Sequence, residues 1–181
     1  MQAARDHENA QGESSGTGRE LTLRALRIED IPQMVQLAVE GLPQLPNYRM
    51  ITPVPERIEY LLRNNIQNAA STQIWVMCDA HTVIQGGGGG WCVPNLLSYD
   101  MVADDIFMWI RPEYRTFKSS ALLIRTYLDW AKARGAKLIR ASHTGGSWPK
   151  GSKEEKMFSL LLQKFGFKEV GTIFHYSAYG D

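Results

Sequence analysis

The stretch that decides the fold is DDIFMWIRPEYRTFKSSALLIRTYLDWAKARG, residues 104–135, which reads as a strand, a short basic turn and a long helix. The strand half, up to Ile110, is rich in β-branched and aromatic residues and is apolar on both faces, as expected of a central strand. Pro112 ends it, because proline cannot donate to a sheet ladder. From Ser120 apolar residues recur at helical spacing, and Gly135 supplies the usual helix stop. The periodic positions are Leu123, Ile124, Tyr127, Leu128 and Ala131.

The turn between strand and helix, Arg115 to Ser120, carries two cations and three hydroxyl side chains. It lies where the amides and the positive dipole end of a helix N-terminus would meet an anion. The residues alone therefore indicate an anion site at this turn.

The segment PEYRTFKSSALLI resembles motif A of the GCN5-related N-acetyltransferase (GNAT) family, R/Q-x-x-G-x-G/A, between the fourth strand and the third helix. Arg115 matches the first position, Lys118 replaces the first glycine and Ser120 stands at the last position. WAKARGAK and KFGFKEVG follow in the family's order, so the resemblance covers about residues 21–178. Phage-encoded members have a similarly glycine-poor loop, which makes a phage origin a further hypothesis.

This resemblance implies acetyl-CoA as co-substrate. Backbone amides of residues 117–121 would surround the pyrophosphate, and Arg115 and Lys118 would add positive charge. The alternative is that Ser119 and Ser120 only cap the helix and the cations are solvated, but the position in the motif favours binding. A backbone N–H near Trp109 or Ile110 would polarise the thioester carbonyl. The implied cofactor-binding residues are Trp109, Ile110, Arg115, Phe117, Lys118, Ser119, Ser120 and Ala121.

Three side chains are candidates for removing the proton of an attacking amine. Asp104 lies eleven residues before Arg115, where several family members place a carboxylate base, and Asp105 points to the opposite face. One of the two is expected in the cleft, although both also fit a polar start of the strand. His143, at the end of the fifth expected strand, is the third candidate.

The acid that returns a proton to the thiolate is usually a tyrosine in this family, at the position that Leu162 occupies here. Tyr176 or Tyr179 replaces it only if the last strand brings one close. A thiol with a pKa of about 8.5 is also a fair leaving group without an acid. Leu162 therefore leaves open whether a cofactor site here is catalytic.

Composition excludes several classes of protein. With 181 residues and 44% hydrophobic content the chain suits one domain, expected at residues 20–181 after a flexible polar leader at 1–19. The net charge of +1 does not indicate a nucleic-acid or membrane partner. No secretory signal or membrane span is expected, and Cys78 and Cys92 lack metal-binding spacing. Reduced thiols, a cytoplasmic location (bacterial, or the host's for a phage protein) and no metal follow as expectations, although a disulfide stays open.

The expected fold is α/β (α+β), a mixed central sheet of six to seven strands with four helices, splayed between strands 4 and 5. The element order β-α-α-β-β-β-α-β-α-β places the last strand around Val170, Ile173 and Phe174. Five glycines, Gly86 to Gly90, follow the third strand, and glycine within a strand usually marks a bulge or a close backbone approach.

These observations support three hypotheses about function. The first is transfer of an acetyl group from acetyl-CoA to a primary amine of a protein or small molecule by direct attack, with Tyr48 and Arg49 as candidate acceptor contacts. The second is a non-catalytic interaction or structural module of the same fold. The third, nucleotide binding by the glycine run, lacks the strand-turn-helix context of a phosphate loop. The family resemblance also implies a possible homodimer through late strands.

Overall fold

The computed structural model describes residues 20–45, 51–141 and 151–170. In chain order the elements are β1 (Thr22–Ala25), α1 (Ile31–Gly41), α2 (Pro55–Gln67), β2 (Thr72–Cys78), β3 (Ile84–Pro94), β4 (Met101–Ile110), α3 (Phe117–Ala133), β5 (Leu138–Arg140) and α4 (Lys153–Lys164). Short 3-10 turns lie at Ile28–Asp30, Leu42–Gln44 and Pro112–Tyr114. In this part of the chain, no helix combines the length and the apolar character that crossing a bilayer requires.

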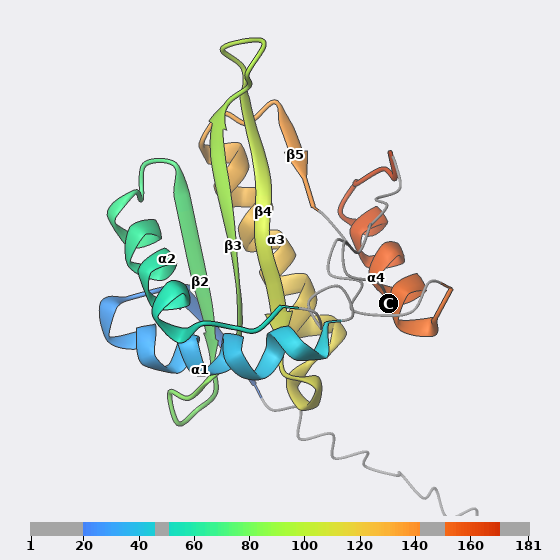
Figure 1. Ribbon diagram of the computed structural model, residues 1–181. Coiled ribbons are helices and arrows are strands. Elements are labelled where there is room, and N and C mark those ends of the chain that lie inside the picture. The colour runs from blue at the N-terminus through green and yellow to red at the C-terminus, as the bar shows by residue number, and fades with distance from the viewer. Residues whose placement is uncertain (1–19, 46–50, 142–150, 171–181) are drawn as a thin grey trace, which may run out of the picture.

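The strands form one mixed sheet in the order β1-β2-β3-β4-β5. The first four are antiparallel neighbours, and β5 runs parallel to β4. Helices α1 and α2 cover one face of the sheet, whereas α3 crosses the other face and α4 lies beyond β5 (Figure 1). The buried core is accordingly divided, with Ile31 and Met34 of α1 on one side and Tyr127 and Ile124 of α3 on the other.

The mixed α+β architecture and the four helices agree with the sequence expectation, but the strand number does not. The described residues contain five strands, not six to seven. Most of the expected last strand, including Ile173 and Phe174, lies outside the described residues, and its first part, Phe167 to Val170, has no regular structure. Val170 is almost fully exposed and lies in none of the five strands.

Helix α3 begins earlier than its apolar pattern predicts. The pattern starts at Ser120, but the Thr116 hydroxyl accepts a hydrogen bond from the Ser119 amide and so fixes the N-terminus at Phe117. This first turn is mostly polar, and hydrophobic periodicity therefore misses it. The end is as expected, because Gly135 has a φ of 75° and closes the helix in the left-handed region.

The five glycines lie inside β3 and explain how closely a helix and the neighbouring strand approach its backbone. A Cβ added at Gly90 would lie 2.7 Å from the Tyr127 ring of α3, and one added at Gly87 would lie 2.6 Å from the Trp75 carbonyl oxygen. At Gly89 the nearest atom would be a side-chain carbon of Ile74, at 3.1 Å. The glycine run therefore makes room for packing on both faces of the sheet, and it is not a phosphate-binding loop.

Adding one methyl group to this run should destabilise the fold by an amount that depends on the position of the substituted glycine. We expect Gly87→Ala and Gly90→Ala each to lower the free energy of unfolding by about 1 to 2 kcal/mol, because a backbone oxygen or a buried ring must move. Gly89→Ala, the control from the same strand, should cost less than about 1 kcal/mol, because its nearest contacts, the Ile74 side chain at 3.1 Å and the Gln73 carbonyl oxygen at 3.2 Å, leave more room than those at Gly87 and Gly90. Urea unfolding measures all three, and equal losses at the three positions would contradict this packing argument.

Candidate active site

A bulge in β4 marks the centre of the candidate site. Gly89 lies opposite Phe107, whereas Gly90 lies opposite Asp105, so Ile106 is an extra residue on β4. β-Bulges are frequent next to active sites, where they redirect side chains and end regular pairing. The parallel pairing of β4 with β5 ends at the same level, with Asp104 opposite Arg140.

Beyond this level one edge of β4 is open. Over residues 20–45, 51–141 and 151–170, no strand pairs with the side of β4 that faces away from β3 after Asp104. β4 itself continues to Ile110. The edge therefore offers backbone donors and acceptors to a ligand or to a further segment of chain.

The hydrogen-bonding register shows which amides this open edge presents. The Arg111 amide donates to the Gln85 carbonyl of β3 at 2.8 Å. Because backbone groups of alternate residues point to opposite sides of a strand, the Trp109 amide also points toward β3. The amides of Met108 and Ile110 point to the open side. Of the two amides expected from sequence, that of Ile110 points to the open side and that of Trp109 points toward β3. The Met108 amide, which sequence reasoning did not single out, also points to the open side.

The N-terminus of α3 lies at the far end of the same edge. The Ser119 amide donates to the Thr116 hydroxyl at 3.1 Å, and the Ser120 amide donates to the Thr116 carbonyl at 3.0 Å. The amide of Ala121 lies within the regular helix. Phe117 and Lys118 hold the first two amides of α3, ahead of any acceptor inside the helix. Of the five amides that were expected to surround the pyrophosphate, only those of Phe117 and Lys118 therefore precede every acceptor inside the helix.

The Ser119 hydroxyl is also committed to the helix end. It accepts from the Thr116 amide at 2.9 Å and lies 2.9 Å from the Tyr114 carbonyl oxygen. Ser119 is buried, whereas Ser120 lines the pocket described below. The capping alternative considered from sequence therefore describes Ser119, and Ser120 is the serine that a ligand can contact.

The two cations of the turn differ in their surroundings. Arg115 is half-buried and donates from Nε and Nη2 to the Ile110 carbonyl oxygen, at 3.2 and 2.9 Å. Burial lowers the pKa of Arg115, and a partly desolvated cation gains from a nearby anion. Lys118 is exposed and forms a surface ion pair with Glu20 at 3.1 Å. Of these two cations, Arg115 is therefore the one that contacts β4.

A pocket joins these features. It has a volume of about 50 Å³ and lies between β4 and the first turns of α3, with Phe158 of α4 on its far side. Ligand pockets typically measure about 300 to 1,000 Å³, so this one holds only a narrow part of a ligand. Its lining is mainly apolar: Met108, Trp109, Ile110, Arg115, Ser120, Leu123, Ile124 and Phe158.

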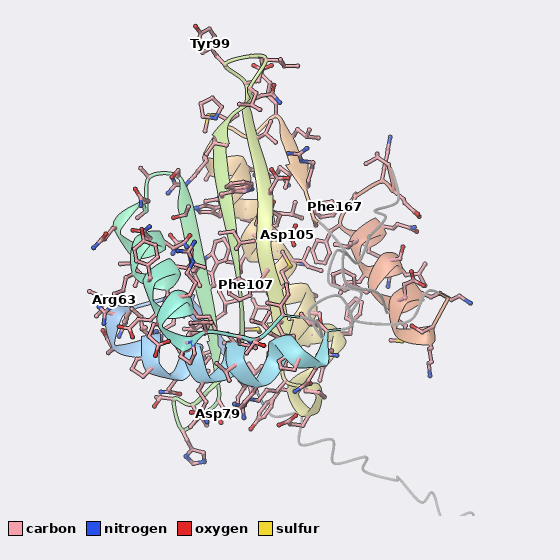
Figure 2. All side chains as sticks on the ribbon, in the orientation of Figure 1. Arg63, Asp79, Tyr99, Asp105, Phe107 and Phe167 are labelled. Carbon is pink, nitrogen blue, oxygen red and sulfur yellow. The ribbon has the colours of Figure 1, made fainter. Side chains whose placement is uncertain are left out.

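The two candidate carboxylates, Asp104 and Asp105, have different surroundings. Both oxygens of Asp104 accept from the Arg140 guanidinium, at 2.5 and 2.8 Å, and this pairing raises the pKa of Arg140. Asp105 lies partway along β4 at the bulge (Figure 2). Burial, with the added charges of Asp105 and Asp104, raises the pKa of Tyr127, whose hydroxyl donates to the Arg140 carbonyl at 2.7 Å. Asp104 thus belongs to a cross-strand ion pair, whereas Asp105 is the first residue of β4 beyond its pairing with β5.

Several expected site residues lie outside the described part of the chain. These are His143, Tyr176, Tyr179, Tyr48 and Arg49. Leu162, at the position of the family's usual acid, packs with Ile124 and Leu128 of α3. Its side chain belongs to the core between α3 and α4.

No protein-family model matches this chain, and no curated protein matches it. Solved structures do match. An acetyltransferase from Trypanosoma brucei is 16% identical with a TM-score of 0.63, over 87% of this chain and 99% of that one. Glucosamine-6-phosphate N-acetyltransferase from Arabidopsis thaliana is 15% identical with a TM-score of 0.62, over 88% and 99%.

A third solved structure of similar fold contains a bound analogue. AAC(6')-Iy in complex with the bisubstrate analogue CoA-S-monomethyl-acetylneamine is 15% identical to this chain, with a TM-score of 0.64 over 87% of this chain and 97% of that one. These neighbours are GNAT-type acetyltransferases, so the chain has the GNAT fold. At such identities the likeness concerns the fold.

Proposed function

We propose that this protein is an N-acetyltransferase that moves the acetyl group of acetyl-CoA to a primary amine of a protein or small molecule by direct attack. One observation carries the proposal: the open edge of β4 beyond the Ile106 bulge leads directly to the N-terminus of α3. The neighbours with this fold are acetyltransferases, and one of them is bound to a CoA-linked analogue. The two free, buried thiols, Cys78 and Cys92, fit a reducing cytoplasm.

The residues present fit the parts of acetyl-CoA. The amides of Phe117 and Lys118 face outward at a positive helix end, where a pyrophosphate gains most. Arg115 adds a partly desolvated positive charge. The apolar walls of the pocket, Leu123 and Ile124, suit the pantetheine arm, whose amides can pair with the open edge of β4.

The reaction needs an oxyanion donor and a base. The amine nitrogen attacks the thioester carbonyl carbon, and the amide of Met108 or Ile110 on the open edge donates to the developing oxyanion. Asp105 accepts the proton that the amine loses. The carbon–sulfur bond then breaks and the CoA thiolate leaves without a residue at position 162 to protonate it. An aliphatic amine with a pKa near 10.4 is mostly charged at neutral pH, so the base decides the rate.

A second candidate function is a GNAT-like interaction or structural module without catalysis. It is favoured by the hydrogen bonds of Arg115 to the Ile110 carbonyl, because they use part of the guanidinium within the protein. Leu162 also favours this module, because it lies in the core at the position where the family usually has a tyrosine acid. Both candidates share the fold and differ in turnover.

Calorimetry with acetyl-CoA and release of free thiol separate the two candidates. We expect acetyl-CoA to bind, and a panel of primary amines to release thiol at rates above the amine-free control. Binding without turnover for every amine supports the module. The acetyltransferase proposal is wrong if acetyl-CoA does not bind and if Arg115→Ala has no effect on thermal stability in the presence of acetyl-CoA.

Phe117→Pro tests the helix amides directly. Phe117 is the first residue of α3, where proline is well tolerated, and the preceding Thr116 already has an extended backbone with φ −116° and ψ 166°. The variant lacks one amide donor, so we expect acetyl-CoA to bind about tenfold more weakly with little change in melting temperature. Calorimetry measures the affinity.

Phe117→Ala is the matched control. It removes the same ring, including its contact with Lys164 at 5.1 Å, but keeps the amide. We expect it to bind acetyl-CoA within about threefold of the wild type. Equal losses in the two variants would assign the effect to the ring and would count against the amide cradle.

A further inference from the structure

Two of the three polar side chains that are buried in the described part of the chain lie beside residues 111–116, the connection between β4 and α3. The three are Asp30, Gln85 and Ser119. Ser119 bonds to backbone groups of this connection. Gln85 belongs to β3, and its backbone carbonyl accepts from the amide of Arg111, the first residue after β4, at 2.8 Å. A buried amide side chain needs hydrogen-bond partners, so the contacts of Gln85 show what it holds in place.

The side chain of Gln85 binds the carboxylate of Asp79, which directly follows β2. Gln85 Nε2 donates to Asp79 Oδ2 at 2.7 Å. The other oxygen, Asp79 Oδ1, accepts from the amides of His81 and Val83 at 2.9 and 3.0 Å. The hydrogen bond from Gln85, followed by those from the backbone, lowers the pKa of Asp79, so this group is ionised at neutral pH. The β2–β3 turn therefore holds the carboxylate in one orientation.

The same carboxylate also reaches the connection directly. The Tyr114 hydroxyl lies 3.5 Å from Asp79 Oδ2, and Tyr114 packs against a buried cluster that includes Leu123 of α3. The Tyr114 carbonyl oxygen in turn lies 2.9 Å from the Ser119 hydroxyl. Asp79 lies at the end of the sheet where β4 ends and α3 begins (Figures 1 and 2). Asp79 is thus linked, through Gln85 and through Tyr114, to both ends of the connection.

Neither Asp79 nor Gln85 lines the pocket, but the groups proposed to bind acetyl-CoA adjoin the segment that they hold. Arg115 lies within the connection, and the outward amides of Phe117 and Lys118 follow it directly. A binding group acts well only when it is held within about 0.5 Å of its productive position by residues that support it. Asp79 and Gln85 have the burial and the contacts of such supporting residues.

We propose that Asp79 and Gln85 are positioning residues of the acetyl-CoA site, an inference that rests on the proposed function. The carboxylate of Asp79 fixes the connection through Gln85 and Tyr114, and the connection holds Arg115 at the edge of β4. Without the bond between Asp79 and Gln85, Arg115 is present but less ordered, so ligand binding has to order it. A role limited to stability predicts another result, namely a lower melting temperature with unchanged affinity.

Reversing the direction of this hydrogen bond tests the proposal. In Asp79→Asn the new amide group faces the amide group of Gln85, and in Gln85→Glu two carboxylates face each other. In the double variant the asparagine amide donates to the glutamate carboxylate, so the bond is restored. We expect each single variant to bind acetyl-CoA about tenfold more weakly, and the double variant to bind within about threefold of the wild type. Calorimetry at neutral pH measures the affinity, and the melting temperature of each variant is recorded without ligand.

Gln85→Met serves as a second variant if the charged ones unfold, because methionine has about the length of glutamine and no amide group. We expect about tenfold weaker binding from this change in the wild type, but less than about threefold in an Arg115→Ala background, because the two residues act in series. Val83→Thr is the control. Val83 is exposed and contacts Asp79 through its backbone, so the affinity should stay within about twofold of the wild type.

The contrary results separate this inference from the proposed function. A wild type that does not bind acetyl-CoA refutes the acetyltransferase proposal and the positioning role together. A wild type that binds, with single variants that keep its affinity, refutes the positioning role alone and leaves the bond as a stabilising contact of the β2–β3 turn. The positioning role is also refuted by a double variant that binds as weakly as the single variants. Equal losses from Gln85→Met with and without Arg115 would show that Gln85 does not act through that residue, and would overturn the inference as well.

Discussion

Asp105→Asn should lower kcat/KM for amine acetylation by about 100-fold, which is at the lower end of the range expected for loss of a general base. The amide has the shape of the carboxylate but cannot take the proton of the attacking amine. We also expect the acid limb of the pH–rate profile to disappear, because the variant lacks the group that must be ionised. Steady-state kinetics across the pH range, with acetyl-CoA binding measured in parallel, separate loss of catalysis from loss of binding.

Asp104→Asn is the matched control on the neighbouring residue. Asp104 accepts both of its hydrogen bonds from Arg140, so an incoming amine would have to displace a bidentate guanidinium to use it. We expect kcat/KM within about threefold of the wild type and a loss of stability below about 1 kcal/mol for this partly exposed pair. A large kinetic defect in Asp104→Asn with a mild one in Asp105→Asn would reverse the assignment.

The elements of this protein could be predicted from local sequence, because their signals are local. Pro55 opens α2, and Gly135 and Gly166 close α3 and α4 with φ of 75° and 87°. Ser152 caps α4 as expected, since its hydroxyl accepts from the Glu155 amide at 3.2 Å. Such signals need only the residues within one turn of the helix end.

The roles of individual residues at the site depend on pairing between distant segments, which local patterns do not contain. The sequence leaves open which of Asp104 and Asp105 faces the cleft, and the register that places Arg140 opposite Asp104 distinguishes their surroundings. The direction of the Trp109 amide likewise follows from pairing with β3, where Trp109 lies opposite Gly87, 22 residues earlier in the chain. A shift of one residue reverses both assignments.

The role of the glycine run, Gly86 to Gly90, also depends on residues that are distant in the sequence. Its sequence indicates a bulge or a close backbone approach. A bulge is indeed in this region, but the extra residue is Ile106 of β4. The glycines themselves are required by side chains from other elements, such as Tyr127 of α3 above Gly90. Nothing near Gly90 in the sequence indicates which ring will lie there.

A buried ion pair before the start of α1 is the place where we expect a substitution to reduce stability most. Asp30 is almost fully buried and accepts from Arg24 at 2.5 and 2.8 Å and from the Arg27 amide at 2.8 Å. It therefore ties β1 to the turn that leads into α1. The hydrogen bonds from Arg24 hold the pKa of Asp30 below its ordinary value, so the folded protein favours the ionised form.

Removing this charge should destabilise the protein by an amount that depends on pH. We expect Asp30→Asn to lower the free energy of unfolding by about 3 kcal/mol at pH 7, because Arg24 loses its partner. The native pKa is depressed, so the wild-type advantage is complete above the unfolded value of about 3.9 and shrinks as pH falls through the lower native value. Urea unfolding at pH 7, 5, 4 and 3 measures this. Glu29→Gln, which changes an exposed carboxylate 3.8 Å from Arg27, should have almost no effect at any pH. A loss in Asp30→Asn that stays constant down to pH 3 would show that the shape of the site matters and the charge does not.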